Sequence, residues 1–273
     1  MIKEKNAFDF FDGKVIKIPF SLFTNDSEKN NSDFPFAFLT VKQSGSMRFR
    51  YNEINENRKN VFDSIDINIE KVIPIELIHS KTVFFLKDGT ESKHKQGDGL
   101  LTCNKNLIPS VTVADCVPIY LFDPVTKCFC IVHSGWKGTG IAKVAIESAQ
   151  KILNAKPENF YAIIGAHIHS CCYSVDSERA NFFYNNFSKD CITQIDDKEN
   201  SFALSLAKAN IAVLKNAGMK EKNILHINTC TCCDDRLGSF RRETVNTALS
   251  PLNFTDANNP PKNFTPMAAF ISW

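Results

Sequence analysis

Nine short apolar segments set the strongest limit on what this chain of 273 residues can fold into. Each segment is rich in β-branched or aromatic residues, which favour strands over helices. In chain order the segments are VIKIPF, FAFLTV, KVIPIELIH, TVFFL, VPIYLF, KCFCIVH, NFYAIIG, NILHIN and MAAFISW. A chain with so many predicted strands must build sheets, and each sheet needs a second layer to cover its apolar face.

Four segments are candidate helices: 56–65, 140–154, 176–187 and 202–217. Asp176 or Ser177 suits the N-cap of the third helix, and Gly218 suits the left-handed residue that ends the fourth. Strands and helices are mixed without strict alternation, so we predict an α+β (mixed α/β) fold rather than a doubly wound sheet. No change in composition marks a boundary, and residues 1–273 are predicted to form a single domain.

Three polar segments are predicted to be loops: 25–34, 87–99 and 247–266. The third contains four prolines and many asparagines, so we expect an exposed excursion before the last strand.

Charge and hydropathy exclude several classes of protein. The 32 basic and 30 acidic residues leave a net charge of +2, which creates no long-range field for nucleic acid. The N-terminal segment carries charges where a signal peptide has its apolar region, and apolar runs such as YAIIGAHI are far shorter than a membrane span. We therefore expect a cytoplasmic protein with no membrane or nucleic-acid partner, whose ten cysteines are mostly reduced.

Three chemically reactive residues lie at predicted strand ends: His79, Cys116 and His133. Side chains at neighbouring strand ends converge on one rim of a sheet. Two imidazoles and one thiolate suit Zn²⁺ and leave its fourth position open, as in catalytic zinc sites. Zinc in such a site lowers the pKa of a bound water toward ~7. The same donors also suit copper.

The spacing of these residues matches no standard metal-binding motif. On the residues alone, Cys116 can equally be a small buried residue, and the histidines can be hydrogen-bonded core or rim residues. The cluster of Cys230, Cys232 and Cys233 likewise fits no standard site by its spacing, and we expect core or loop thiols there.

The sequence motifs around these residues are more specific. ADCVPI, VHSGWKGT, IGAHIHSCCYSVD, NTCT, SFRRE and AAFIS occur in that order between His79 and Trp273. This series resembles the YfiH-like family, also called laccase-domain proteins, multicopper polyphenol oxidases or peptidoglycan editing factors. The resemblance implies a fold with central β-sheets packed between helices. It also implies one zinc ion bound by His79, Cys116 and His133.

The resemblance further implies a purine nucleoside enzyme. Its reactions would be phosphorolysis of adenosine, inosine, guanosine and methylthioadenosine, together with deamination of adenosine. Phosphorolysis needs a cationic site for phosphate. The candidates are Arg58 in NENRKN, Lys137 in HSGWKGT, and Arg241 or Arg242 in SFRRE. For any one of them an exposed surface position is the alternative. Asp115 is a candidate to orient a metal ligand, with a capping role as its alternative.

Several positions depart from the family pattern. Leu77 and Ser80 replace the usual glutamine and glycine, and Lys137 replaces an arginine that could hold phosphate through two parallel hydrogen bonds. His167 and His169 are additions, which we expect to be exposed loop histidines, although they could line the pocket or extend the metal site. For Cys171 and Cys172 we expect a structural role, and segment 247–266 would lie at the pocket mouth.

Two other functions remain open from the sequence. A copper-dependent phenol oxidase is disfavoured, because multicopper sites need many histidines and this chain has six. A peptidoglycan-editing cysteine hydrolase would use Cys116 as nucleophile and His133 as base, and in a non-enzymatic role the metal would be structural. The sequence predicts neither the preferred nucleoside nor an oligomeric state.

Overall fold

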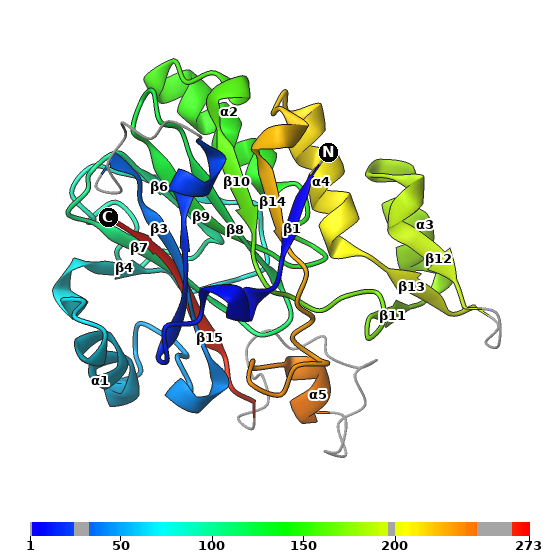
Figure 1. Ribbon diagram of the computed structural model, residues 1–273, viewed down its shortest axis with the longest axis horizontal. Helices are drawn as coiled ribbons and strands as arrows, with labels where there is room; N and C mark the ends of the chain where they lie inside the picture. The colour runs from blue at the N-terminus through cyan, green and yellow to red at the C-terminus, as the bar shows by residue number, and fades with distance from the viewer. Residues whose placement is uncertain (1, 25–32, 196–199, 245–263) are drawn as a thin grey trace.

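The computed structural model describes residues 2–24, 33–195, 200–244 and 264–273 (Figure 1). Its largest element is a mixed sheet of seven strands in the order β1-β14-β10-β8-β9-β6-β5. In that order the strands are β1 (Lys3–Lys5), β14 (Ile224–Ile227), β10 (Tyr161–Ile164), β8 (Val117–Phe122), β9 (Phe129–Ser134), β6 (Gly99–Thr102) and β5 (Val83–Leu86).

A second sheet of five strands packs face to face against the first. Its strands, in order, are β2 (Val15–Pro19), β3 (Phe36–Thr40), β15 (Met267–Ser272), β7 (Ile108–Val113) and β4 (Val72–Pro74). Alternation along the strands explains the stacking, since neighbouring residues point to opposite faces. Tyr120 and Phe122 of β8 face the core between the two sheets, and the Tyr120 hydroxyl donates to the Phe38 carbonyl at 2.8 Å.

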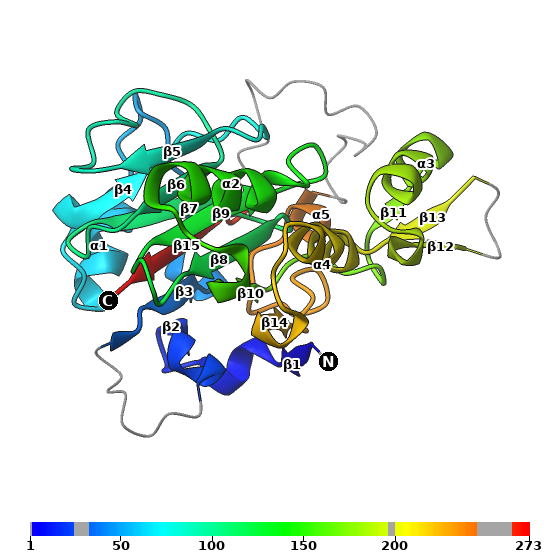
Figure 2. The ribbon, with the colours of Figure 1, turned by 90° about the horizontal axis from the view of Figure 1, so that it is seen from above.

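Helices cover the outer faces of both sheets, which confirms the predicted mixed α/β architecture (Figures 1 and 2). Helices α2 (Ile141–Leu153) and α4 (Leu206–Asn216) pack against the seven-stranded sheet through buried residues such as Ala145. Helix α1 (Glu56–Ser64) packs against the five-stranded sheet, with Phe62 on Phe270 at a ring-centroid distance of 5.2 Å.

A smaller unit lies at one end of the molecule, at the right of Figure 1. It contains α3 (Ser177–Asn186) and a sheet of three strands in the order β11 (Ser174–Val175), β13 (Phe202–Leu204), β12 (Ile192–Gln194). The short helix α5 (Phe240–Thr244) follows the loop after β14. No helix within the described ranges is long and apolar enough to cross a membrane.

Local capping chemistry was predicted well. Asp176 is the N-cap of α3, its side chain accepting from the Arg179 amide at 2.8 Å. Gly218 follows α4 with a left-handed φ of 96°, as expected for a residue without a Cβ.

Two segment predictions were wrong, and some strands were not predicted. Residues 202–204 form strand β13, and α4 begins only after its N-cap Ser205, because β13 pairs with strands on both sides. The strand in KVIPIELIH ends at Pro74, so His79 lies in a loop and not at a strand end. Strands β1, β6, β7, β11 and β12 were not predicted. Most of the polar segments 25–34 and 247–266 lies outside the described residues.

Candidate metal centre

One end of the central strands β8 and β9 of the seven-stranded sheet brings together His79, Cys116 and His133. Cys116 immediately precedes β8, and His133 lies near the end of β9, opposite Pro118 in the antiparallel β8–β9 pair. His79 reaches them from the loop between β4 and β5. One ligand atom of each residue lies within 4.8 Å of the other two. The sequence prediction that these three residues form a group is thus matched by their positions, although His79 arrives from a loop.

Asp98 contacts two of the three candidate ligands, one through its side chain and one through its backbone. Its carboxylate is fully buried and lies 2.9 Å from Nδ1 of His133. The same carboxylate accepts from the backbone amide of His79 at 3.0 Å and from both the amide and hydroxyl of Ser80. These bonds stabilise the left-handed backbone of His79, whose φ is 57°. A carboxylate that holds one nitrogen of a histidine leaves the other free to bind metal.

Asp98 was missed in the sequence, where Asp115 was the candidate for orienting a ligand. Instead, the Asp115 carboxylate accepts from the Thr231 hydroxyl and the Arg241 amide, both at 2.6 Å. It therefore connects the loop before β8 to the segments around α5. The only signal for Asp98 was its place in QGDGL, directly before β6.

Gly135 leaves space for the three candidate ligands. A Cβ at this position would lie 3.0 Å from the Cys116 sulfur and 3.2 Å from Cδ2 of His79. Either distance is shorter than ordinary van der Waals contact, so a side chain here would displace the ligands. This explains the glycine in HSGWKGT in terms of geometry.

The site is strongly polarised even without a metal. Burial opposes ionisation of Cys116, but the charge of His133 and hydrogen bonds from both histidines lower its pKa to about 6. Burial likewise opposes protonation of His133, but the Cys116 thiolate and Asp98 raise its pKa to about 10. A thiolate is the form of cysteine that binds metal. The donor set and the space beside Gly135 therefore fit a zinc ion.

The predicted phosphate-binding residues have different positions. Arg58 is only 6% exposed on α1, where Nη1 donates to the Met47 carbonyl and the guanidinium lies over Phe49 and Phe62. Burial lowers its pKa to about 10. Figures 1 and 2 show α1 at the opposite end of the molecule from α3. Its hydrogen bond and ring contacts within the described ranges are with Met47, Phe49 and Phe62, and none is with His79, Cys116 or His133.

Lys137 and Arg241 lie closer to the centre. Lys137 is exposed in the turn after His133, with Nζ 5.3 Å from the Trp136 ring centroid. The Arg241 guanidinium lies 5.6 Å from the centroid of the Tyr173 ring. Burial raises the pKa of Tyr173, the charge of Arg179 lowers it, and the charge of Cys116 raises it.

Arg179, which the sequence did not indicate, faces the same region. Its guanidinium lies 4.3 Å from the centroid of Trp136, and its Nε is buried without a hydrogen-bond partner among the described residues.

Two imidazoles and a thiol around one glycine, at the edge of a sheet, define a candidate mononuclear metal centre. A family model described as multi-copper polyphenol oxidoreductase laccase matches residues 35–248. Because this match covers well over half of the 273 residues, the chain belongs to that family.

Relatives of this chain carry the name purine nucleoside phosphorylase. One from Clostridium acetobutylicum is 28% identical over 235 residues, covering 84% of this chain and 92% of that protein. Human purine nucleoside phosphorylase LACC1 is 27% identical over 200 residues, which make up 71% of this chain and 45% of the human protein. The chain thus spans less than half of the human relative.

Solved structures share the fold. Hypothetical protein YfiH of Bacillus licheniformis matches with a TM-score of 0.73 and 26% identity, covering 87% of this chain and 92% of that one. YlmD from Geobacillus stearothermophilus matches with the same TM-score of 0.73 at 23% identity, covering 87% of this chain and 91% of that one. These comparisons confirm the family that the sequence motifs predicted, and they confirm its mixed α/β fold.

Proposed function

We propose that this protein is a zinc-dependent purine nucleoside phosphorylase, acting on adenosine, inosine, guanosine and methylthioadenosine, and that it also deaminates adenosine. The observation that carries the proposal is the convergence of His79, Cys116 and His133 beside Gly135, with Asp98 fixing two of them. The names of the relatives support the substrate class.

His79, Cys116 and His133 would hold the zinc ion. Bound zinc supplies a Lewis acid that lowers the pKa of a water molecule toward ~7, which suits attack on C6 of adenosine at neutral pH. Asp98 holds the Nδ1 proton of His133 and so keeps the other ring nitrogen directed at the site. In deamination, the water oxygen bonds to C6 and the C6–N6 bond breaks, releasing ammonia.

Phosphorolysis uses the cationic residues around Tyr173 and Trp136. Arg241, Lys137 and Arg179 are the proposed phosphate ligands, since charge-assisted hydrogen bonds from arginine or lysine bind phosphate strongly. A phosphate oxygen bonds to C1′ of the ribose as the C1′–N9 bond breaks. The electron pair stays on the purine, which takes up a proton.

A second candidate function is that of a cysteine hydrolase. Cys116, His133 and Asp98 are arranged as a nucleophile, its base and the group that orients the base. This function requires a metal-free Cys116, because a thiolate that binds zinc no longer attacks. The nearness of His79 to the same sulfur favours metal binding. A copper-dependent phenol oxidase is the third candidate, and a non-enzymatic role with a structural metal is the fourth.

The test incubates zinc-loaded protein with the four nucleosides, with and without phosphate, and separates the products by chromatography. We expect free base and ribose 1-phosphate, or methylthioribose 1-phosphate, only when phosphate is present. Inosine should form from adenosine without it. His79→Gln should abolish both reactions, and His94→Gln, an exposed histidine outside the site, should leave them unchanged.

The same experiment separates the alternatives. A chelator should stop the nucleoside reactions, whereas a cysteine hydrolase acting on peptidoglycan fragments would keep or gain activity. Oxygen consumption with phenols by copper-loaded protein would support the oxidase. If zinc-loaded protein yields none of the nucleoside products, the proposal is wrong.

A further inference from the structure

Three other histidines form a cluster outside the site described above. His167 and His169 follow β10, and His226 lies in β14, the parallel neighbour of β10, paired with Ile164. One ring nitrogen of each lies within 4.8 Å of the other two. The ring centroids are 4.6 Å apart for His167–His169 and 5.6 Å apart for the other two pairs. His167 is only 1% exposed, which contradicts the expectation of exposed loop histidines.

The hydrogen bonds of two of these rings fix their tautomers. Nδ1 of His167 lies 2.8 Å from the Gly165 carbonyl, which can only accept, so Nδ1 carries the proton. Nδ1 of His226 lies 3.1 Å from a carboxylate oxygen of Glu4, which assigns its proton in the same way. In both rings Nε2 is then left as an unprotonated acceptor.

Two ring nitrogens of the cluster lack a hydrogen-bond partner. Nε2 of His169 and Nε2 of His226 are both buried with no hydrogen-bond partner in the part of the chain that the structure describes. A buried polar atom without a partner destabilises the fold, because it has lost its hydrogen bonds to water. Lone pairs gathered in this way are stabilised together by a cation.

We propose that His167, His169 and His226 bind a divalent metal ion, zinc or an ion of similar preference for imidazole. The carbonyl and the carboxylate on the opposite ring nitrogens are the partners that metal-binding histidines usually have. Tetrahedral zinc with Zn–N bonds of ~2.0 Å holds its nitrogens roughly 3.3 Å apart, so the rings close slightly around the ion. A water molecule or small anion completes the tetrahedron.

Burial and the neighbouring histidines also favour the neutral form of His167 and His169. Burial and the neighbouring histidines lower the pKa of His167, and burial and His226 lower that of His169 to about 4. Neutral imidazole is the form that binds metal.

A second cluster, made of sulfur, lies next to the first. The structure brings together Cys171, Cys172, Cys230 and Cys233, whose sulfurs all lie within 4.8 Å of one another. The Cys172–Cys233 distance is 3.3 Å, Cys171–Cys233 is 3.6 Å and Cys171–Cys172 is 3.8 Å. Zinc with four Zn–S bonds of ~2.3 Å holds its sulfurs roughly 3.8 Å apart.

The sulfur spacing assigns this cluster as a second, four-thiolate zinc site. The spacing suits one ion, and Cys230 and Cys233 form a C-x-x-C pair of the kind found in structural zinc sites. The amide of His169 donates to the Cys230 sulfur at 3.3 Å, a bond typical of metal-bound thiolates. The sequence does not indicate this site, because the two pairs of cysteines lie about sixty residues apart and neither pair alone provides four ligands.

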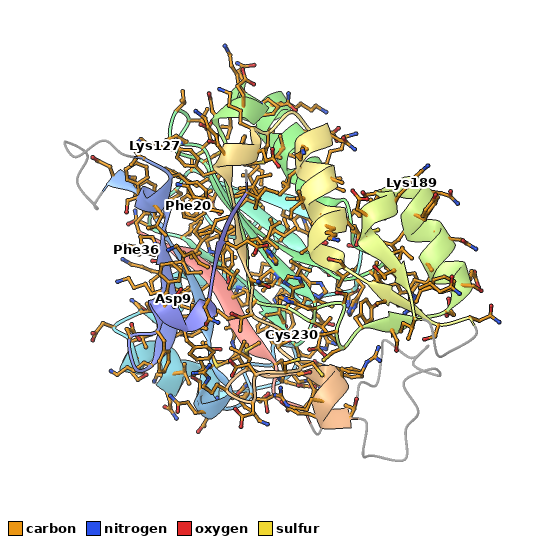
Figure 3. All side chains as sticks on the ribbon, turned by 45° about the vertical axis from the view of Figure 1, so that its right-hand side comes forward. Asp9, Phe20, Phe36, Lys127, Lys189 and Cys230 are labelled. Carbon is orange, nitrogen blue, oxygen red and sulfur yellow. The ribbon has the colours of Figure 1, made fainter. Side chains whose placement is uncertain are left out.

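Both clusters join the segment after β10 to β14 or to the segment that follows β14. Cys230, labelled in Figure 3, lies between the large sheet and α5. Metal binding here would fix the segments that carry Thr231 and lead to Arg241, both of which contact Asp115 beside Cys116. The role of the histidine site is structural, because the His169 and His226 nitrogens are closed off from solvent.

The test measures zinc alone, in protein purified under reducing conditions, by elemental analysis. Wild-type protein should hold one zinc per cluster in addition to any at His79. His169→Gln should lose one equivalent and Cys233→Ser a different one. The matched controls His94→Gln and Cys103→Ser, both outside the clusters, should lose none. This count does not depend on catalytic activity, so it is separate from the test of the proposed function.

Cobalt substitution distinguishes the sites in wild-type protein, even if a variant fails to fold. Adding Co²⁺ should give the visible bands of tetrahedral cobalt. The bands from the histidine site should lack sulfur-to-cobalt charge transfer, because that site has no cysteine ligand. Folded His169→Gln should lose that set alone, and folded Cys233→Ser should lose most of the charge transfer. Unchanged zinc content and spectra in a folded variant would overturn the corresponding site. A Cys172–Cys233 disulfide in freshly purified protein would overturn the thiolate site.

Discussion

Asp98→Asn is the substitution that most directly tests how the metal centre is built. The buried carboxylate accepts from His133 Nδ1 and the His79 amide through one oxygen, and from two Ser80 donors through the other. Asparagine keeps the volume but removes the charge and one acceptor. If the asparagine oxygen accepts from His133, its NH₂ group faces the Ser80 amide. Both of these groups are hydrogen-bond donors, so the Ser80 amide loses its acceptor.

The expected effects are large enough to separate. Loss of a group that orients a metal ligand typically weakens metal binding by ~10–100-fold, which is ~1.4–2.8 kcal/mol. Leaving the Ser80 amide without an acceptor should lower the free energy of unfolding by a further ~1–3 kcal/mol. The first effect is measured by zinc competition with a chromophoric chelator, and the second by urea unfolding of the metal-free protein.

Asp123→Asn is the matched control. Asp123 is also fully buried and accepts from the Val125 amide and the Thr126 hydroxyl, but at the opposite end of the β8–β9 hairpin. It should lower stability without changing zinc affinity. Wild-type zinc affinity in Asp98→Asn, or an equal loss in Asp123→Asn, would refute the role assigned to Asp98.

Four further outcomes are expected. Gly135→Ala should weaken zinc binding about tenfold in the chelator assay, because its Cβ would lie 3.0 Å from the Cys116 sulfur. In chelator-treated protein, iodoacetamide should alkylate Cys116 at a rate that rises around pH 6 instead of near 9, and zinc should protect it, as mass spectrometry can show. Arg241→Ala should raise the KM for phosphate roughly tenfold in the phosphorolysis assay, whereas Arg58→Lys should leave it unchanged and lower the melting temperature. Folding lowers the pKa of His169 from 6.5 to about 4, so the unfolded chain binds the proton more tightly. As the pH is lowered from 6.5 to about 4, the free energy of unfolding of the metal-free protein in urea should therefore fall by up to about 3 kcal/mol. His169→Gln should not show this loss.

The sequence predicted those parts of the fold that depend on local chemistry. The β8–β9 hairpin, the cap at Asp176 and the termination at Gly218 each follow from residues within a few positions of one another. The strand at 202–204 was missed because its partners, β11 and β12, lie elsewhere in the chain. Helical spacing in 202–217 was overruled there by sheet pairing.

The site was predicted only where a motif carried it. Cys116 and His133 were found through ADCVPI and HSGWKGT, but Asp98 lies 35 residues before His133 and belongs to no motif that the sequence indicated. The histidine and cysteine clusters depend on the parallel register of β10 and β14, which sets Ile164 beside His226. That register brings together side chains about sixty residues apart, and no spacing rule contains it.

The contacts of Asp115 restrict which amino-acid substitutions this chain can accept during evolution. Its backbone is left-handed, with a φ of 82°, and its carboxylate and carbonyl bind three separate segments through Thr231, Arg241 and Ile168. A substitution in any one of these segments alters the position of the residue next to Cys116. The segments therefore cannot accept mutations independently, and compensating changes should occur in pairs across more than a hundred residues of sequence.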